Sequence, residues 1–309
     1  MVLHSKIGII ATSNKMIYAW ILIVINILIA VPFLTLLERK VLGYIQSRKG
    51  PKKVSYLGLL QPVSDGVKLI LKNMGILKLS NIVVFWIAPI LSFLLMILAW
   101  SIFPSFYSYY SLTLRGLFFL CITRLQVYTL LGAGWRSNSK YALLGSLRGV
   151  AQTISYEVSL IFILFFPCSL EHRYKWLLFQ DKTYVYLLII FHIFFMWLIS
   201  CLAETNRAPF DFAEGERELV SGFNIEFSAL GFTFLFLSEY GNILLMRFLR
   251  ALLFIPYNFF FKVIIGSLIA FWFVWVRGSL PRFRYDFLMD LCWKRFLVTS
   301  LLSFFILLL

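Results

Sequence analysis

Residues 203–227 read AETNRAPFDFAEGERELVSGFNIEF, a polar segment between two long apolar ones. Within it, residues 204–226 hold six of the fourteen acidic residues of the chain: Glu204, Asp211, Glu214, Glu216, Glu218 and Glu226. Unpaired charge held against a membrane is costly and is usually functional. Apolar side chains are interleaved with the acids, at Phe210, Phe212 and Leu219. This pattern favours a polar, partly enclosed chamber over a loop that is fully exposed to solvent.

The composition places the chain among membrane proteins. Of its 309 residues, 61% are hydrophobic and 18% are aromatic, and the mean hydropathy is +0.87. A water-soluble core cannot bury so much apolar surface. The net charge is +15, from 29 bases and 14 acids. Because most of the bases lie between apolar segments, this charge indicates membrane topology and not a nucleic-acid partner.

Apolar runs of about 20 residues are long enough to cross a bilayer as helices. The sequence predicts eight of them, so we expect an all-α polytopic protein. The expected spans are 16–37, 82–103, 114–134, 146–166, 184–203, 224–246, 257–276 and 294–309.

The distribution of bases predicts how these spans are oriented. If the spans alternate, 19 of the 29 bases lie on the side of the loop that follows the first span. By the positive-inside tendency, this side faces the cytoplasm or the mitochondrial matrix, and both termini lie outside. We find no internal repeat, and we therefore expect a single membrane domain over residues 1–309.

The first inside loop contains a short amphipathic segment. From about Leu59, apolar residues recur at helical spacing, while Gln61, Asp65, Lys68 and Lys72 occupy the other face. Such a segment is too short and too charged to span, so it predicts a helix lying in the membrane interface. An ordinary packing role for the same helix stays open.

The fourth span carries polar residues on two opposite faces. Arg148, Gln152, Ser155 and Ser159 form one stripe, and Glu157 lies about half a turn away. Both faces should therefore be surrounded by protein or line a wet cavity. An acid inside a span usually marks an ion or proton path, although Glu157 could instead only hold helices together.

Other charged residues also fall inside predicted spans, and three of them bear on proton transfer or charge pairing. Glu239 in the sixth span is a second candidate for proton transfer, and we expect it nearer the outside end. Arg115 and Arg124 in the third span could pair with such acids or extend toward the interface.

The cysteines and histidines predict no metal and no redox centre on this chain. Its four cysteines form no C-x-x-C pair, and its three histidines are scattered, with one inside a span. This disfavours structural zinc, an iron–sulfur cluster and a bis-histidine haem.

Four segments together resemble the subunit 1 family of NADH:ubiquinone oxidoreductase, respiratory complex I. They are LLERKVLGYIQSRKGP at 36–51, YALLGSLRGVAQTISYEVSL at 141–160, the acidic segment at 203–227 and PRFRYDFLMDLCWK at 281–294. The resemblance covers essentially the whole chain, and the first and third segments are its most specific parts.

The resemblance implies a membrane-arm subunit whose inside loops, 38–81 and 204–223, help form a chamber for ubiquinone, the substrate. Iron–sulfur clusters and FMN would belong to partner subunits of the hydrophilic arm, and other membrane subunits and lipids would adjoin this chain. The implied chamber residues are Arg39, Arg48, Glu204, Arg207, Asp211, Phe212, Glu214, Glu216 and Glu218. The residues implied in proton coupling are Glu38, Glu157, Glu204, Glu226 and Glu239.

The location implied by the resemblance is the mitochondrial inner membrane, with a bacterial plasma membrane as the alternative. Arg124, the basic run 247–250 and segment 167–183 do not match the family pattern. Three other functions remain open: the membrane subunit of a related hydrogenase-type complex, a stand-alone proton-coupled transporter, and a structural anchor. The transporter predicts inverted repeats, which we do not find.

Overall fold

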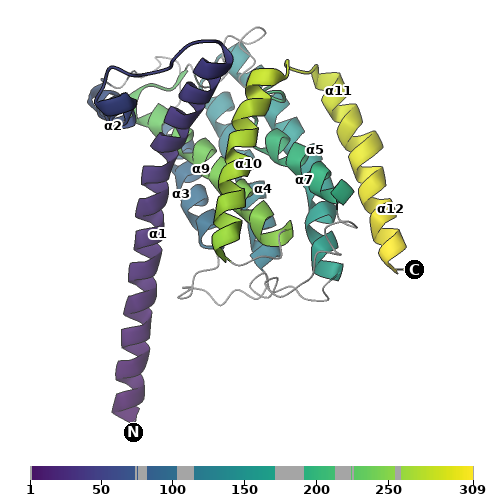
Figure 1. Ribbon diagram of the computed structural model, residues 1–309, viewed down its shortest axis with the longest axis horizontal. Coiled ribbons are helices and arrows are strands. Elements are labelled where there is room, and N and C mark those ends of the chain that lie inside the picture. The colour runs from purple at the N-terminus through teal and green to yellow at the C-terminus, as the bar shows by residue number, and fades with distance from the viewer. Residues whose placement is uncertain are drawn as a thin grey trace.

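The computed structural model describes residues 2–73, 75, 82–102, 115–170, 191–212, 224, 226–254 and 259–308, and these form helices and short connections (Figure 1). The helices are α1 (Val2–Ile45), α2 (Gln61–Leu71), α3 (Ile82–Trp100), α4 (Arg115–Arg136), α5 (Lys140–Leu170), α7 (Phe191–Glu204), α9 (Ala229–Phe254), α10 (Phe259–Ser279), α11 (Tyr285–Asp290) and α12 (Leu297–Leu308). A 3-10 turn, η1 (Tyr56–Gly58), precedes α2, and a π-helical turn, η4 (Leu291–Phe296), joins α11 to α12.

A helix is found at each of the eight expected spans, which confirms the all-α class. In the described ranges, five helices are long and apolar enough to cross a membrane: 17–45, 115–136, 140–169, 229–254 and 262–279. Phe85–Trp100 and Phe191–Glu204 are shorter apolar helices. Residues 184–190 of the expected fifth span lie outside the described residues.

Several helix ends differ from the expected boundaries. The first helix continues through Glu38 to Ile45, because nothing between Glu38 and Gly50-Pro51 breaks a helix. The last helical segment begins at Tyr285, nine residues before the expected start at 294, since only Pro281 interrupts it.

The extent of helix α9 corrects one expectation directly. Because α9 runs from Ala229 to Phe254, Glu239 lies ten residues from its first residue and fifteen from its last. Glu239 is therefore nearer the end that follows the acidic segment, and not nearer the opposite end as the apolar run 224–246 predicted.

Small residues allow the central helices to approach closely. A Cβ on Gly134 of α4 would lie 2.0 Å from Ser146 Oγ of α5, and a Cβ on Gly241 of α9 would lie 2.7 Å from Met96 of α3. The indole of Trp100 also donates to the Gly241 carbonyl, at 3.2 Å. Close backbone approach of this kind supplies the packing that holds helices together in lipid.

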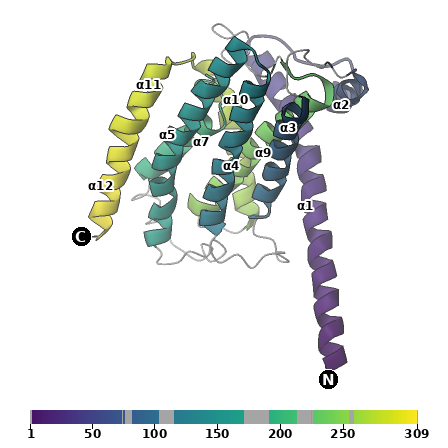
Figure 2. The same ribbon diagram turned by 180° about the vertical axis from the view of Figure 1, so that it is seen from behind.

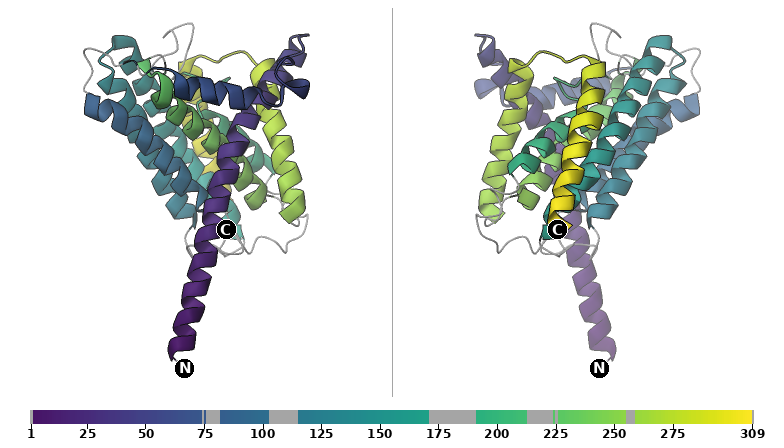
Figure 3. Two further views of the ribbon diagram at one scale, coloured as in Figure 1. Left: turned by 90° about the vertical axis from the view of Figure 1, so that its left-hand side faces the viewer. Right: turned by 90° about the vertical axis from the view of Figure 1, so that its right-hand side faces the viewer.

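The amphipathic segment forms α2, as predicted. This helix packs against α1 and α9, and it crosses the end of the bundle at a steep angle to α1 (Figure 3). Its apolar face stays exposed at Val63, Val67, Ile70 and Leu71. Both chain termini point to the side of the bundle away from α2, with the start of α1 projecting beyond the bundle and the end of α12 on the opposite flank (Figures 1 and 2).

Candidate functional site

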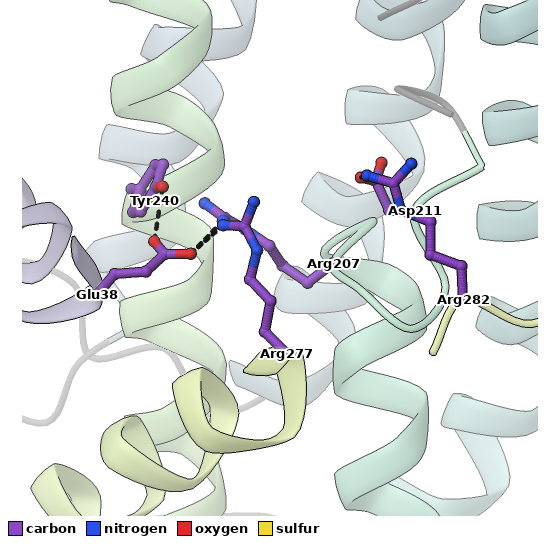
Figure 4. A network of polar contacts seen from close by, with 6 residues as sticks. All are labelled: Glu38, Arg207, Asp211, Tyr240, Arg277 and Arg282. Atoms are coloured by element: carbon purple, nitrogen blue, oxygen red, sulfur yellow. Dashed lines mark hydrogen bonds and ion pairs between the residues drawn. The ribbon is translucent and has the colours of Figure 1, made fainter. Parts of the chain in front are cut away.

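A buried carboxylate near the end of α1 is bound by three side chains from other parts of the chain. Glu38 Oε1 accepts hydrogen bonds from Arg207 Nη1, at 3.1 Å, and from Arg277 Nη1. Glu38 Oε2 accepts from the Tyr240 hydroxyl at 2.8 Å, and Figure 4 shows the four side chains converging. We call these four residues the Glu38 cluster.

The Glu38 cluster joins three helices to the acidic segment. Tyr240 comes from α9, Arg277 comes from the last turn of α10, and Arg207 lies three residues after the end of α7. The guanidinium of Arg207 also stacks on the Tyr240 ring, 4.0 Å from its centroid. Burial by itself would lower the pKa of Arg207, but Tyr240 and Glu38 raise that pKa above its usual value. Arg207 therefore remains a cation that keeps its counter-charge beside it.

A second set of contacts holds the described part of the acidic segment, residues 204–212. Gln152 of α5 is fully buried, and its Nε2 donates to the carbonyls of Ala203, at 2.8 Å, and Phe210, at 2.9 Å. Asp211 pairs with Arg282 at 3.4 Å. The side-chain amide of Gln152 therefore attaches both ends of the turn after α7 to α5, which satisfies this buried polar group of the α5 stripe.

Aromatic contacts attach the same segment to the start of α11. Phe210 stacks on Phe283 with a centroid separation of 5.6 Å, and Phe212 meets Tyr285 edge-on at 5.8 Å. Both phenylalanines are buried. These contacts agree with an enclosed and not a fully solvated segment, as far as Phe212.

The second candidate centre is a cavity of about 90 Å³ among α3, α4, α5, α7 and α9. Its lining includes the acids Glu204 and Glu239 together with Thr205, Asn206, Gln126 and Asn242. A water needs only about 10–15 Å³ of such space, so the cavity has room for several. Carboxylates beside water in an apolar bundle are suited to taking up and releasing protons.

Glu157 lies one turn along α5 from Thr153, which lines this cavity. It is buried in α5 and pairs through Oε2 with Arg124 Nε at 3.5 Å. Glu157 and Glu204 are close enough for their charges to interact. Of the two polar faces of the fourth span, Gln152, Ser155 and Ser159 on one and Glu157 on the other are buried, as predicted, whereas Arg148 is half-buried. Of the two roles left open for Arg124, the structure shows pairing with an acid.

Two adjacent residues of α9 connect the two centres. Glu239 lines the cavity, whereas Tyr240 binds Glu38. Glu239 also interacts electrostatically with Arg207. A change of charge at either centre would therefore alter the protonation equilibria of the acids at the other.

The remaining predicted residues lie apart from these centres or outside the described residues. Arg39 pairs with Asp65 of α2 at 2.5 Å, with both side chains partly exposed. Arg48 is exposed beyond α1. Glu226 is half-buried before α9 and is not among the residues lining the cavity. Glu214, Glu216 and Glu218 lie outside the described residues.

The sequence did not identify Tyr240 and Arg277 of the Glu38 cluster as site residues. It also did not predict the hydrogen bonds that Gln152 makes. Tyr240 directly follows a predicted acid, and Arg277 ends a predicted span, so both carried a weak signal. Among the described residues, no group of three or more histidine, cysteine or acidic side chains could hold a metal ion.

Comparisons with known proteins match almost the whole chain. The family model described as NADH dehydrogenase matches residues 18–308. NADH-ubiquinone oxidoreductase chain 1 of Aedes aegypti is 54% identical over 295 residues, with 93% of each chain covered. The protein of that name from Locusta migratoria is 52% identical over 296 residues, again with 93% of each chain covered. The one from Danio rerio is 48% identical over 289 residues, covering 90% of this chain and 89% of the relative.

Proposed function

This chain belongs to the NADH dehydrogenase family, and from that premise we propose that it is a core membrane subunit of proton-translocating NADH:ubiquinone oxidoreductase, respiratory complex I. The names of the relatives support this assignment, and their animal sources support a multi-pass location in the mitochondrial inner membrane. The relatives also favour this function over a hydrogenase-type complex, a transporter or an anchor.

Within the complex, we propose that this chain helps form the chamber that ubiquinone enters. The inside loops 38–81 and 204–223 of a single membrane domain would form it, with both termini on the opposite side of the membrane. The observation that carries the assignment is the Glu38 cluster, because it ties the acidic segment to three helices at the end of the bundle beside α2. The proposed chamber residues are Arg39, Arg48, Glu204, Arg207, Asp211, Phe212, Glu214, Glu216 and Glu218.

Reduction of ubiquinone to ubiquinol consumes two electrons and two protons. Partner subunits of the hydrophilic arm, which carry FMN and the iron–sulfur clusters, would supply the electrons. Negative charge arriving at the quinone, or its demand for protons, would alter the balance of charge around Glu38 and Arg207.

The acids of the cavity would carry the response into the membrane. Closely spaced carboxylates titrate as a coupled set, so a change of charge beside Arg207 can redistribute protons among several of them. Glu239 is placed to receive that change, since it interacts with Arg207 and lines the cavity with Glu204. Glu38, Glu157 and Glu226 complete the proposed coupling set.

Photo-crosslinking with an azido-quinone tests the chamber. The native assembly is purified, labelled and digested, and its subunits are identified. We expect labelled peptides within 38–72 or 204–226, together with co-purifying iron–sulfur subunits. An active complex with no label on this chain would show that it does not form the chamber.

Replacement of Glu157 by Gln tests the coupling. In assembled complex we expect proton pumping per quinone reduced to fall, because the amide cannot exchange a proton. The matched control is Asp286→Asn, since Asp286 is 72% exposed and lies outside the coupling set, and a loss of pumping as large as that of Glu157→Gln would count against a specific role for Glu157. Undiminished pumping in Glu157→Gln would remove Glu157 from the coupling set.

A further inference from the structure

Arg124 occupies an unusual place for a charged residue. It lies nine residues from the start and twelve from the end of α4, which is about 14 Å and 18 Å along a helix rising 1.5 Å per residue. The apolar core of a bilayer is about 30 Å thick, so Arg124 sits near mid-membrane. Its side chain is 62% exposed on this chain.

An arginine at that depth cannot simply face lipid. A charged side chain at the centre of a membrane-spanning helix is costly, because the hydrocarbon core cannot hydrate it. Long basic side chains reach the interface from positions near helix ends, and Arg124 is about two and a half turns from the start of α4 and more than three from its end. Such residues instead face protein or a water-filled cavity.

Other exposed residues of α4 define the same face. Cys121, Leu125 and Tyr128 are exposed, and their spacing places them on one side of the helix with Arg124. Tyr128 is 71% exposed and lies one turn beyond Arg124, about 12 Å from the end of α4. Figure 2 shows α4 on the near side of the bundle, between α3 and α5.

The pairing of Arg124 leaves donors for another chain. Its ion pair with Glu157 is made through Nε, and the two Nη groups carry four further N–H donors in a planar fork. Such a fork matches the two oxygens of a carboxylate. If Glu157 takes up a proton, as the proposed function requires, Arg124 also loses its only described counter-charge.

We propose that this face of α4 is covered by a transmembrane helix of a neighbouring membrane subunit, which presents a carboxylate to Arg124. This inference rests on the proposed function, because it requires an assembly with other membrane subunits. The contact would place an acid of the partner beside Glu157 and the cavity.

Site-specific photo-crosslinking in the assembled complex tests the proposal. Tyr128 is replaced by p-benzoylphenylalanine, and the adducts are identified by mass spectrometry. The matched control is the same replacement at Phe271 of α10, which is 50% exposed and lies among exposed apolar residues such as Leu268 and Trp275. We expect Tyr128 to give a cross-link to one peptide of a co-purifying membrane subunit, and Phe271 to give lipid adducts.

Substitution of Arg124 then tests the charge pair. In Arg124→Leu we expect the Tyr128 cross-link to fall at least tenfold, whereas Arg124→Lys should keep most of it. Arg124→Glu combined with an acid-to-Arg change in the cross-linked peptide should restore it.

Three results would overturn the proposal: lipid adducts alone at Tyr128, a cross-linked peptide without an acid within one helical turn, or a cross-link unaffected by Arg124→Leu. If these appear in a complex that still contains the iron–sulfur subunits and reduces quinone, the proposed function stands without this interface. If no other membrane subunit co-purifies with active protein, both fail.

Discussion

The Glu38 cluster makes a specific prediction about the stability of the acidic segment. In Glu38→Gln, the amide oxygen can still accept from the arginines, but its NH₂ group must then face the Tyr240 hydroxyl. Arg207 keeps a hydrogen bond and loses the carboxylate that is hydrogen-bonded to it. Arg207 belongs to the turn after α7, where its backbone N–H donates to the Leu202 carbonyl at 3.1 Å. Loss of the Glu38 charge should therefore make this turn less stable.

The size of the effect follows from the geometry. Removing one partner of a buried ion pair costs about 3–5 kcal/mol. Arg277 is 36% exposed and can be solvated when Glu38 is neutral. Because an acceptor also remains, we expect about 2–3 kcal/mol. Tyr240→Phe removes one hydrogen bond but keeps the ring under Arg207, so it should cost less, about 1.5 kcal/mol.

Hydrogen–deuterium exchange of the assembled complex measures this locally. Since about 1.4 kcal/mol corresponds to a factor of ten, amides of residues 205–212 should exchange about 30- to 150-fold faster in Glu38→Gln. The control is Arg39→Gln, which breaks a partly exposed pair worth about 1 kcal/mol or less. If Glu38→Gln changes exchange in 205–212 no more than Arg39→Gln does, the Glu38 cluster does not anchor the segment and our reasoning is wrong.

Three further predictions concern packing and pH. Gln152→Leu removes both hydrogen bonds from α5 to the acidic segment, whose Ala203 and Phe210 carbonyls then keep only their backbone partners, the N–H groups of Asn206 and Phe212. That segment should therefore lose about 1–3 kcal/mol of local stability, measured by the same exchange experiment. Gly134→Ala forces α4 away from α5 and should cost about 1–3 kcal/mol, lowering the thermal inactivation temperature of the complex; Gly66→Ala, where a Cβ meets nothing within 4 Å, should leave it unchanged or raise it. Burial alone would raise the pKa of Asp65, but hydrogen bonds and charge from Arg39, with help from neighbouring side chains, lower it below its usual value. The stabilisation this carboxylate supplies is present above its unfolded pKa of about 3.9 and is lost only as pH falls through the lowered value. Exchange in α2, corrected for its intrinsic pH dependence, should therefore stay constant from pH 8 to pH 5, and a rise within that window would contradict the assignment.

Local patterns in the sequence predicted the helices well. Eight apolar runs gave eight helices, and the alternation of apolar and charged residues from Leu59 gave α2. These features depend on neighbours within one or two helical turns, so a linear sequence contains them. The boundaries were less accurate where a polar residue continues a helix, as Glu38 does in α1.

Candidate acids were also visible in the sequence, because charge is rare inside apolar segments. The sequence identified Glu38, Glu157, Glu204 and Glu239 by this rule alone or with the family resemblance. It did not indicate which base serves which acid. The pairing of Arg124 with Glu157, for example, joins two helices that each would have been unstable in lipid alone.

The sequence by itself therefore determined the class of protein, the helices and the residues too polar to face lipid. The tertiary structure decided the partners. Glu38 binds Arg207, Tyr240 and Arg277, which are 169, 202 and 239 residues away in the chain. Those contacts depend on which helices pack together and on their relative position along the helix axes. The physical reason is that secondary structure follows from local periodicity, whereas the counter-charge of a buried acid is whatever residue the packing of distant helices brings within hydrogen-bond distance.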